Sequence, residues 1–302
     1  MQFHAGEIAV QAQAGVREEA KTLHHLISNL IKPAAQIFLS TQQLAIASTV
    51  DTNGRVWASL LTGEPGFVKV LNQQTVQVDA ISVPSDPLHH NLHGNNQIGL
   101  LVIDLTNRKR LRLNGQAEIQ PQRQINITIE QAFFNCPKYI QARHLELETT
   151  ESSPELQILI AQTLSTTHQN LIAQADTFFI GSYAQKAGAD ASHRGGYPGF
   201  VQVLNSNKLV FPDYAGNNMF QTLGNFAVNP QAGLLFINFT EGHILQLTGT
   251  VKVIWERERL TSFAGAQRLV EFDIEQIIET QNATLLRWRF GSYSPANPSF
   301  DE

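Results

Sequence analysis

The stretch SHRGGYPGFVQVLN, residues 192–205, repeats an earlier stretch of the same chain, SLLTGEPGFVKVLN, residues 59–72. Both keep Pro-Gly-Phe-Val and then alternate apolar and polar residues, which is typical of a strand. Their longest difference is that residues 193–195 read HRG where residues 60–62 read LLT. The chain therefore contains two related segments, and only the second carries a basic motif.

The repetition extends well beyond this phrase. NNQIGLLVIDL (95–105) returns as NPQAGLLFINF (229–239), and KRLRLNGQAEI (109–119) returns as HILQLTGTVKV (243–253), each 134 residues later. A further match, ITIEQ with FDIEQ, keeps the same order at a slightly larger offset. A period this long indicates a duplicated domain, since it is too long for the unit of a solenoid.

Each copy is predicted to be rich in short strands with one helix between them. In the first copy we expect a helix near 86–93 and strands near 42–50, 55–61, 67–72, 75–80, 97–104 and 109–119. In the second copy we expect a helix near 217–227 and strands near 177–182, 199–204, 208–211, 232–239 and 243–254. This pattern indicates a mainly β fold, with a small β-barrel and added helices in each copy.

The same pattern predicts the division of the chain into domains. Residues 1–34 form an N-terminal helical or extended segment, with a helix over 16–31. The first barrel covers 35–149, and the second covers 175–302. Between them, 150–174 is predicted to be a helical connector, because its apolar residues have helical spacing.

Composition limits the classes of function. The chain has 302 residues, 42% of them apolar and 16% charged, which suits a globular protein. The formal net charge of −5 gives no global positive field that would attract nucleic acid or an anionic membrane. No signal peptide or spanning segment is evident, so we expect a cytoplasmic protein. The single cysteine, Cys136, excludes an intramolecular disulfide and a cysteine-based zinc site.

The basic motif of the second copy is the first candidate site. His193 and Arg194 replace two leucines at a strand end, after Ser192 and before Gly195. A guanidinium group beside a glycine backbone that a ligand can approach closely suits a phosphate. The alternative is a solvated surface arginine followed by a simple turn.

A second candidate lies in PDYAGNNMFQTLGNFAVNP, residues 212–230. Asn217 and Asn218 are predicted at the N-terminus of a helix, with Thr222 about one turn later. Asparagine is a favoured N-cap, which is a purely structural role. A helix N-terminus also offers free N–H groups to anions, so the two roles are compatible. The first copy has a different polar set here, SDPLHHNLHGNN (85–96).

This order of motifs, once per repeat over nearly the whole chain, resembles the pyridoxamine 5′-phosphate oxidase-related FMN-binding split barrels. The resemblance implies two tandem split barrels that form a pseudo-dimer and bind FMN. It also implies an arginine-bearing strand and a helix start that hold the cofactor. The lysine that contacts the pyridine substrate in that family has no counterpart here, which argues against the same substrate. The residues that match the family's cofactor-binding positions in the second copy are Ser192, His193, Arg194, Gly195, Asn217, Asn218 and Thr222.

Members of that family are commonly homodimers in which a basic strand of the partner reaches the flavin. The matching strand here, KRLRLNG, places Arg110 at the flavin-contacting position, and Arg112 shares its side of the strand. The counterpart of Arg110 in the second copy is Ile244. One complete site is therefore expected between the two barrels of a single chain, which would be a monomeric pseudo-dimer or a homodimer.

The resemblance implies an FMN-dependent oxidoreductase that acts with a small-molecule substrate or electron donor. The alternative is a non-catalytic flavin or haem binding or sensing protein on the same barrel, since a fold does not fix a function. A haem binder would need an axial ligand such as His193.

Three weaker features receive no catalytic or metal role. His89 and His93 are spaced like a metal-binding pair but lack an accompanying carboxylate motif, so we assign no metal. Cys136 is expected to be a small packing residue. The run Arg-Trp-Arg at 287–289 could cover a flavin edge or could only close the second barrel.

Overall fold

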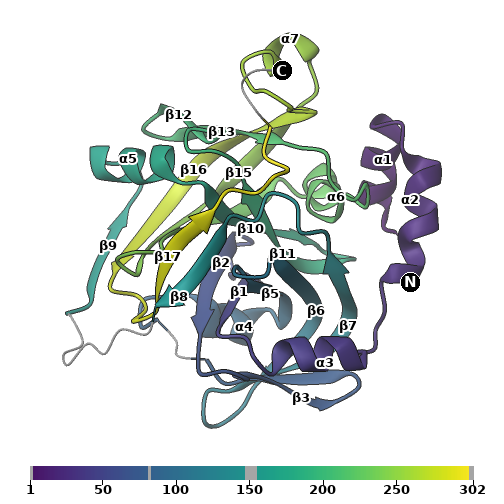
Figure 1. The fold of residues 1–302 in the computed structure, drawn as a ribbon, viewed down its shortest axis with the longest axis vertical. Coiled ribbons are helices and arrows are strands. Elements are labelled where there is room, and N and C mark those ends of the chain that lie inside the picture. The colour runs from purple at the N-terminus through teal and green to yellow at the C-terminus, as the bar shows by residue number, and fades with distance from the viewer. Residues whose placement is uncertain (1–2, 81–82, 147–154, 299–302) are drawn as a thin grey trace.

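The computed structural model describes residues 3–80, 83–146 and 155–298, and it contains two large antiparallel sheets, one in each copy of the repeat (Figure 1). The strands of the first sheet are β1 (Leu44–Val50), β2 (Val56–Thr62), β3 (Val68–Asn72), β4 (Thr75–Val78), β5 (Gln97–Asp104), β6 (Lys109–Ile119) and β7 (Ile125–Asn135). The strands of the second sheet are β9 (Gln157–Ala161), β10 (Thr177–Ala184), β11 (Gly188–Gly195), β12 (Gln202–Asn205), β13 (Lys208–Asp213), β14 (Gln231–Asn238), β15 (His243–Ile254) and β16 (Arg268–Gln281).

The two sheets have the same topology. The first runs β2-β1-β5-β6-β7-β4-β3, and the second runs β11-β10-β14-β15-β16-β13-β12, with β9 added beside β16. Strand for strand, β1 corresponds to β10 and β7 corresponds to β16. The predicted mainly β fold of two tandem split barrels is confirmed.

The register of the strands confirms that the basic motif of the second copy aligns with the two leucines of the first. Ala58 of β2 pairs with Ser48 of β1, and Ala191 of β11 pairs with Gly181 of β10. Ser59 and Ser192 directly follow these two alanines and hold equivalent positions. Leu60 and Leu61 therefore correspond to His193 and Arg194.

The helix of each copy is held by an equivalent buried amide. The helices are α4 (Leu88–Gly94) and α6 (Gln221–Val228). Asn91 of α4 donates to Thr49 Oγ1 at 3.0 Å, and Asn225 of α6 donates to Ser182 Oγ at 2.9 Å. Each bond joins the helix to the first strand of its own barrel, so the two copies share side-chain detail as well as topology.

The N-terminal helix expected over 16–31 is only partly correct. The segment forms α2 (Arg17–Leu23) and a 3-10 turn, η1 (His24–Leu26). Ser28 then exchanges backbone hydrogen bonds with Ala132 of β7, which draws the chain out of the helix and onto the sheet. Two further helices precede the first sheet: α1 (Ala5–Gln13) and α3 (Pro33–Leu39).

The helical connector expected over 150–174 is also only partly correct. Residues 150–154 lie outside the described residues, 157–161 form strand β9, and α5 covers Thr166–Gln174. The reason is the length of β16, which pairs with β13 only through its first six residues. The rest of that edge, residues 277–281, is free to pair with β9. The expected boundaries at 34, 149 and 174 remain predictions.

The last elements are α7 (Arg257–Leu260) and a small two-stranded sheet of β8 (Ala142–Glu146) and β17 (Arg287–Ser292). Trp288 of β17 is buried against Phe239, with ring centroids 5.6 Å apart. It belongs to an apolar cluster that takes residues from both barrels, including Leu60 and Ile244. Each barrel has a separate interior cluster of its own.

The barrels approach so closely that two equivalent glycines have no space for a side chain. A Cβ atom on Gly99 of β5 would lie 2.5 Å from the Cα of Asp190 on β11. A Cβ atom on Gly233 of β14 would lie 2.8 Å from the Cα of Trp57 on β2. The obstructing atoms belong to main chain, which cannot rotate away, so these glycines fix the distance between the barrels.

Within the described part of the chain, no helix is both long enough and apolar enough to cross a membrane.

Gly99→Ala should therefore destabilise the protein by about 3 kcal/mol, because the methyl group forces β5 and β11 apart. Urea unfolding measures this loss. The matched control is Gly216→Ala, whose Cβ atom would lie 4.0 Å from the carbonyl oxygen of Tyr214, and we expect it to change stability by less than about 0.5 kcal/mol. Equal losses in the two variants would contradict a tight contact between the barrels.

Candidate functional site

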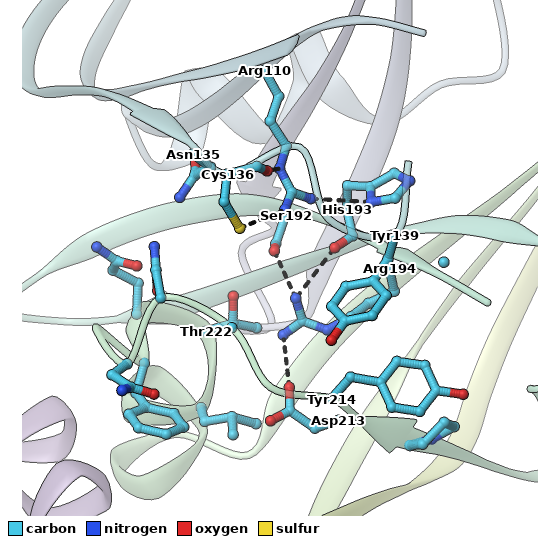
Figure 2. Close-up of a pocket in the computed structure, with 18 of the residues that line it drawn as sticks. Arg110, Asn135, Cys136, Tyr139, Ser192, His193, Arg194, Asp213, Tyr214 and Thr222 are labelled. Carbon is cyan, nitrogen blue, oxygen red and sulfur yellow. Dashed lines mark hydrogen bonds and ion pairs between the residues drawn. The ribbon is translucent and has the colours of Figure 1, made fainter. Parts of the chain in front are cut away.

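A pocket lies between the two barrels, at the ends of β6 and β7 from the first and beside β11 and α6 from the second (Figure 2). The pocket has a cavity volume of about 90 Å³ and is partly open to solvent. The structure brings all eight of the predicted site residues together in its wall. They are Arg110, Ser192, His193, Arg194, Gly195, Asn217, Asn218 and Thr222.

A buried ion pair across the two barrels forms the floor of this region. Arg112 Nη1 lies 2.9 and 3.0 Å from the two carboxylate oxygens of Asp190, and its Nη2 donates to Ser192 Oγ at 2.8 Å. The carboxylate also accepts from Asn114 Nδ2 and Thr222 Oγ1, both at 3.1 Å. Burial of both charges is tolerated because every carboxylate oxygen is paired and hydrogen-bonded.

Arg110 joins the barrels a second time. Its Nη1 lies 3.0 Å from His193 Nδ1, and its Nε donates to the carbonyl oxygen of Cys136 at 3.1 Å. Burial, together with Arg110, Arg194 and Arg143, lowers the pKa of His193 well below its usual value. The imidazole is therefore neutral. Because a guanidinium can only donate, Nδ1 accepts and the ring hydrogen is on Nε2.

Arg194 is the cation of the basic motif, and 21% of its side chain is exposed. Its Nη1 donates to Ser192 Oγ at 3.0 Å, and its Nη2 lies 3.5 Å from Asp213 (Figure 2). Asp213 is also 3.6 Å from the Nε atom of Arg268. Both distances exceed those of close charge-assisted bonds, so Arg194 keeps donor capacity for an anion.

Ser192 is also positioned to donate to an anion. Its oxygen accepts hydrogen bonds from Arg112 and Arg194. A serine hydroxyl carries one proton of its own, and that proton remains available when both lone pairs accept.

The charges around the pocket are unequal. Four guanidinium groups and two carboxylates lie in its wall or directly against it, which leaves two positive charges for a ligand to neutralise. The groups counted are Arg110, Arg112, Arg194 and Arg268 against Asp190 and Asp213.

Backbone strain concentrates at this pocket. Six residues other than glycine have positive φ in the described ranges, and three of them line the pocket: Tyr139 (66°), Asn218 (60°) and Phe220 (61°). Such conformations cost energy and persist only where the surroundings impose them. Their clustering here supports a functional role for this part of the molecule.

The expected helix start at 217 is wrong. Helix α6 begins at Gln221, and its N-cap is Phe220, whose left-handed backbone interrupts the helical run. Asn217 and Asn218 therefore lie in the preceding loop, where they still reach the pocket but cap no helix. Thr222 lies in the first turn. No side chain caps the helix, so its first N–H groups face the loop without a capping partner.

The equivalent position in the first copy is filled by apolar side chains. Leu60 is 1% exposed where the second copy has His193, and Ile244 is completely buried where the first copy has Arg110. Val83 joins them in the cluster between the barrels. The two leucines noted in the sequence are thus core residues.

A carboxylate accepts the hydrogen bonds of the polar side chains that remain at this apolar position of the first copy. Asp86, just before α4, accepts from Ser59 Oγ at 2.6 Å and from Gln246 Nε2 at 2.9 Å. Its burial raises its pKa to about 6. Ser59 is the counterpart of Ser192, so the serine that is free to donate in one copy is occupied in the other.

Several residues in or against the pocket were not among the predicted site residues. Arg112 had a signal, because it shares one side of the strand with Arg110, and Asp190 shares the face of Ser192 by the two-residue strand period. Tyr139 and Tyr214 lie outside regular strands and gave no periodic signal. Cys136 lines the pocket, and its carbonyl and side chain contact Arg110.

From the sequence, Trp288 could cover a flavin edge or only close the second barrel. It lies in the cluster between the barrels and does not line this pocket.

Family comparison identifies the class of protein. The model of the pyridoxamine 5′-phosphate oxidase family matches residues 31–149 and again residues 164–289. The chain therefore belongs to this family and contains its domain twice. No curated protein sequence matches the chain significantly.

Three solved structures each align with about two fifths of the chain. HupZ from Group A Streptococcus is 10% identical, covering 38% of this chain and 92% of its own, with a TM-score of 0.31. A putative pyridoxamine 5′-phosphate oxidase from Lactobacillus delbrueckii is 13% identical, covering 39% and 94%, with a TM-score of 0.31. An FAD-binding protein from Mycobacterium smegmatis is 14% identical, covering 39% and 96%, with a TM-score of 0.28.

Helix α1 brings a buried carboxyl group close to the ion pair beneath the pocket. Glu7 is 6% exposed and accepts a hydrogen bond from the backbone N–H of His4 at 2.8 Å. Burial, with a smaller contribution from the like charge of Asp190, raises the pKa of Glu7 to about 7. The packing of α1 on α6 is close, because a Cβ atom on Gly224 would meet Glu7.

This raised pKa predicts a pH-dependent penalty. The folded state binds the Glu7 proton more tightly than the unfolded chain, so the penalty is absent below pH 4.5, grows as the pH rises, and is complete above about pH 7. A shift of this size corresponds to about 3 kcal/mol. Glu7→Gln should therefore raise the free energy of unfolding by up to about 3 kcal/mol at pH 8 and change it little at pH 4.5. Urea unfolding at both pH values tests this, and an equal effect at the two would contradict it.

Proposed function

We propose that this chain binds one FMN molecule in the pocket between its barrels and works as an FMN-dependent oxidoreductase. The observation that carries the proposal is the excess of guanidinium groups around a pocket between two copies of the pyridoxamine 5′-phosphate oxidase domain. We further propose that it is cytoplasmic and acts with a small-molecule substrate or electron donor.

The pocket wall carries the donors that a phosphate needs. The pocket is partly open to solvent, so a ligand held by its phosphate can extend outward from it. Arg194 and the free proton of Ser192 supply donors to the phosphate, while Asp213 stays neutralised by Arg268. Two uncompensated positive charges match a phosphate dianion.

FMN, when bound, supplies the electron or hydride transfer, and the protein supplies binding and orientation. Arg110 keeps a positive charge at the pocket wall, although burial lowers its pKa to about 10. Its bond to His193 holds that ring neutral and fixed, so the imidazole neither takes nor gives a proton near neutral pH. The proposed role of both residues is therefore to shape and polarise the site.

The proposed arrangement needs one chain only. Arg110 and Arg112 come from the barrel predicted at 35–149, and the serine and arginine of the basic motif come from the barrel predicted at 175–302. We propose a monomer that works as a pseudo-dimer, although a homodimer would keep the same site.

The haem alternative finds no support in the site. An axial histidine must present a free ring nitrogen to the iron. The Nδ1 atom of His193 accepts from Arg110, and its buried Nε2 atom carries the ring hydrogen, so neither nitrogen offers a free lone pair to iron. A flavin-binding protein without turnover remains the alternative, and assaying reduction of the bound flavin by candidate electron donors separates it from an enzyme.

The purified protein should release one FMN per chain, because the equivalent position in the first copy is filled by Leu60, Ile244 and Val83. Heat release followed by chromatography measures the amount of flavin against protein and distinguishes FMN from FAD. A ratio near two would show that the apolar position also binds flavin, and release of FAD would reject FMN as the cofactor.

Arg194→Ala should weaken FMN binding by about one to two orders of magnitude, because a charge-assisted contact to phosphate contributes about 1.5–3 kcal/mol. Riboflavin, which lacks the phosphate, should lose little affinity. Fluorescence titration of the apoprotein with each ligand gives both values.

Lys109→Ala is the matched control, because it removes a cation from the exposed side of β6 next to Arg110. We expect it to leave both affinities unchanged. If Arg194→Ala weakened riboflavin and FMN equally, Arg194 would not be recognising the phosphate.

A further inference from the structure

Two tyrosines from different barrels meet at the pocket wall. Tyr139 follows β7 of the first copy, and Tyr214 follows β13 of the second. Their ring centroids are 5.1 Å apart with an interplanar angle of 36°, and both residues line the pocket beside Arg194 (Figure 2). One face of Tyr139 is therefore supported by Tyr214, while the ring itself borders the space open to a ligand.

Tyr139 holds this position in a strained conformation. Its φ of 66° lies in the left-handed region, which a bulky residue rarely adopts. Its carbonyl oxygen packs so closely on Gly195 that a Cβ atom there would overlap it. A glycine at residue 139 would relieve the strain, so the presence of tyrosine indicates that the ring itself is needed there.

The surroundings fix both ends of Tyr139. Its N–H donates to Ser294 Oγ at 3.1 Å, and its carbonyl accepts from Gln141 Nε2 at 3.1 Å. Its hydroxyl donates to the carbonyl of Ala215 at 2.9 Å, across to the loop of the second barrel. The hydroxyl proton is thus already used, and what the residue offers to a ligand is its aromatic ring.

Gln141 connects this tyrosine to the last described segment of the chain. Its side chain is fully buried, and its Oε1 accepts from the N–H of Ser294 at 2.7 Å and from Asn297 Nδ2 at 3.1 Å. Its Nε2 donates to the carbonyls of Tyr139 and Gly196. The amide therefore locks the tyrosine, the residue that follows β11 and the segment 294–297 into one arrangement.

We propose that Tyr139, supported by Tyr214, is the aromatic surface on which the planar ring of the flavin stacks, and that Gln141 positions it. The inference rests on the proposed function, because it assigns the ring of the same ligand whose phosphate Arg194 would hold. The two ends of the pocket would therefore bind different parts of the ligand. The cationic end recognises the phosphate, and the aromatic end recognises the ring.

The test uses riboflavin, which has the ring without the phosphate, and the full-length apoprotein. Tyr139→Ala should weaken riboflavin and FMN binding equally, by roughly five- to tenfold, whereas Tyr139→Phe should keep wild-type affinity because it keeps the ring. A tyrosine stacked on a flavin also quenches its fluorescence, so bound flavin should become brighter in the alanine variant.

Tyr139→Gly separates ring binding from stability. It should melt at a higher temperature than Tyr139→Ala, because glycine accepts the left-handed backbone, yet it should show the same loss of riboflavin affinity. The matched control is Tyr183→Ala, which removes a half-buried tyrosine that does not line this pocket and should leave riboflavin affinity unchanged.

Two outcomes would overturn the inference in distinguishable ways. If the wild-type protein binds riboflavin and Tyr139→Ala binds it equally well with unchanged fluorescence, the stacking role is wrong and the proposed flavin function stands. If the wild-type apoprotein binds neither riboflavin nor FMN, the proposed function and the stacking role both fail.

Discussion

The close contact of backbone on backbone between the barrels is the constraint on which the site depends. Gly99 leaves no side chain between β5 and β11, so the strand bearing Asp190 and Ser192 lies directly against the first barrel. At that distance Arg112 reaches across and forms a buried ion pair. A bulkier residue at the contact would separate the charges and leave each of them buried without its partner.

The same geometry has opposite results in the two copies. Where the second copy carries a histidine and an arginine, the meeting strands enclose a polar pocket. Where the first copy carries leucines, they enclose apolar core, and Asp86 satisfies the polar groups that remain. In a symmetric dimer every substitution appears on both sides of the interface. A single chain with two copies is free of that restriction, which accounts for one open and one closed position.

Sequence reasoning succeeded where the signal was local and repeated. The duplicated phrases predicted both sheets and the correspondence of Leu61 with Arg194, because strand period and order survive in the residues themselves. The sequence did not predict the features that depend on tertiary contacts. The left-handed Phe220 moved the start of α6, and the free edge of β16 drew residues 157–161 into a strand. The partner of Arg112 depends on how two barrels dock, which no local pattern contains.

The ion pair of Arg112 and Asp190 can form only late in synthesis of the chain. The two residues are 78 positions apart in the chain, so the arginine leaves the ribosome well before its carboxylate exists. At ordinary translation rates the delay is roughly 4–16 seconds. During that interval the first barrel has a cationic, unpaired face and an uncovered apolar surface around Leu60. Both surfaces become covered only when the second barrel has been made and has docked on the first.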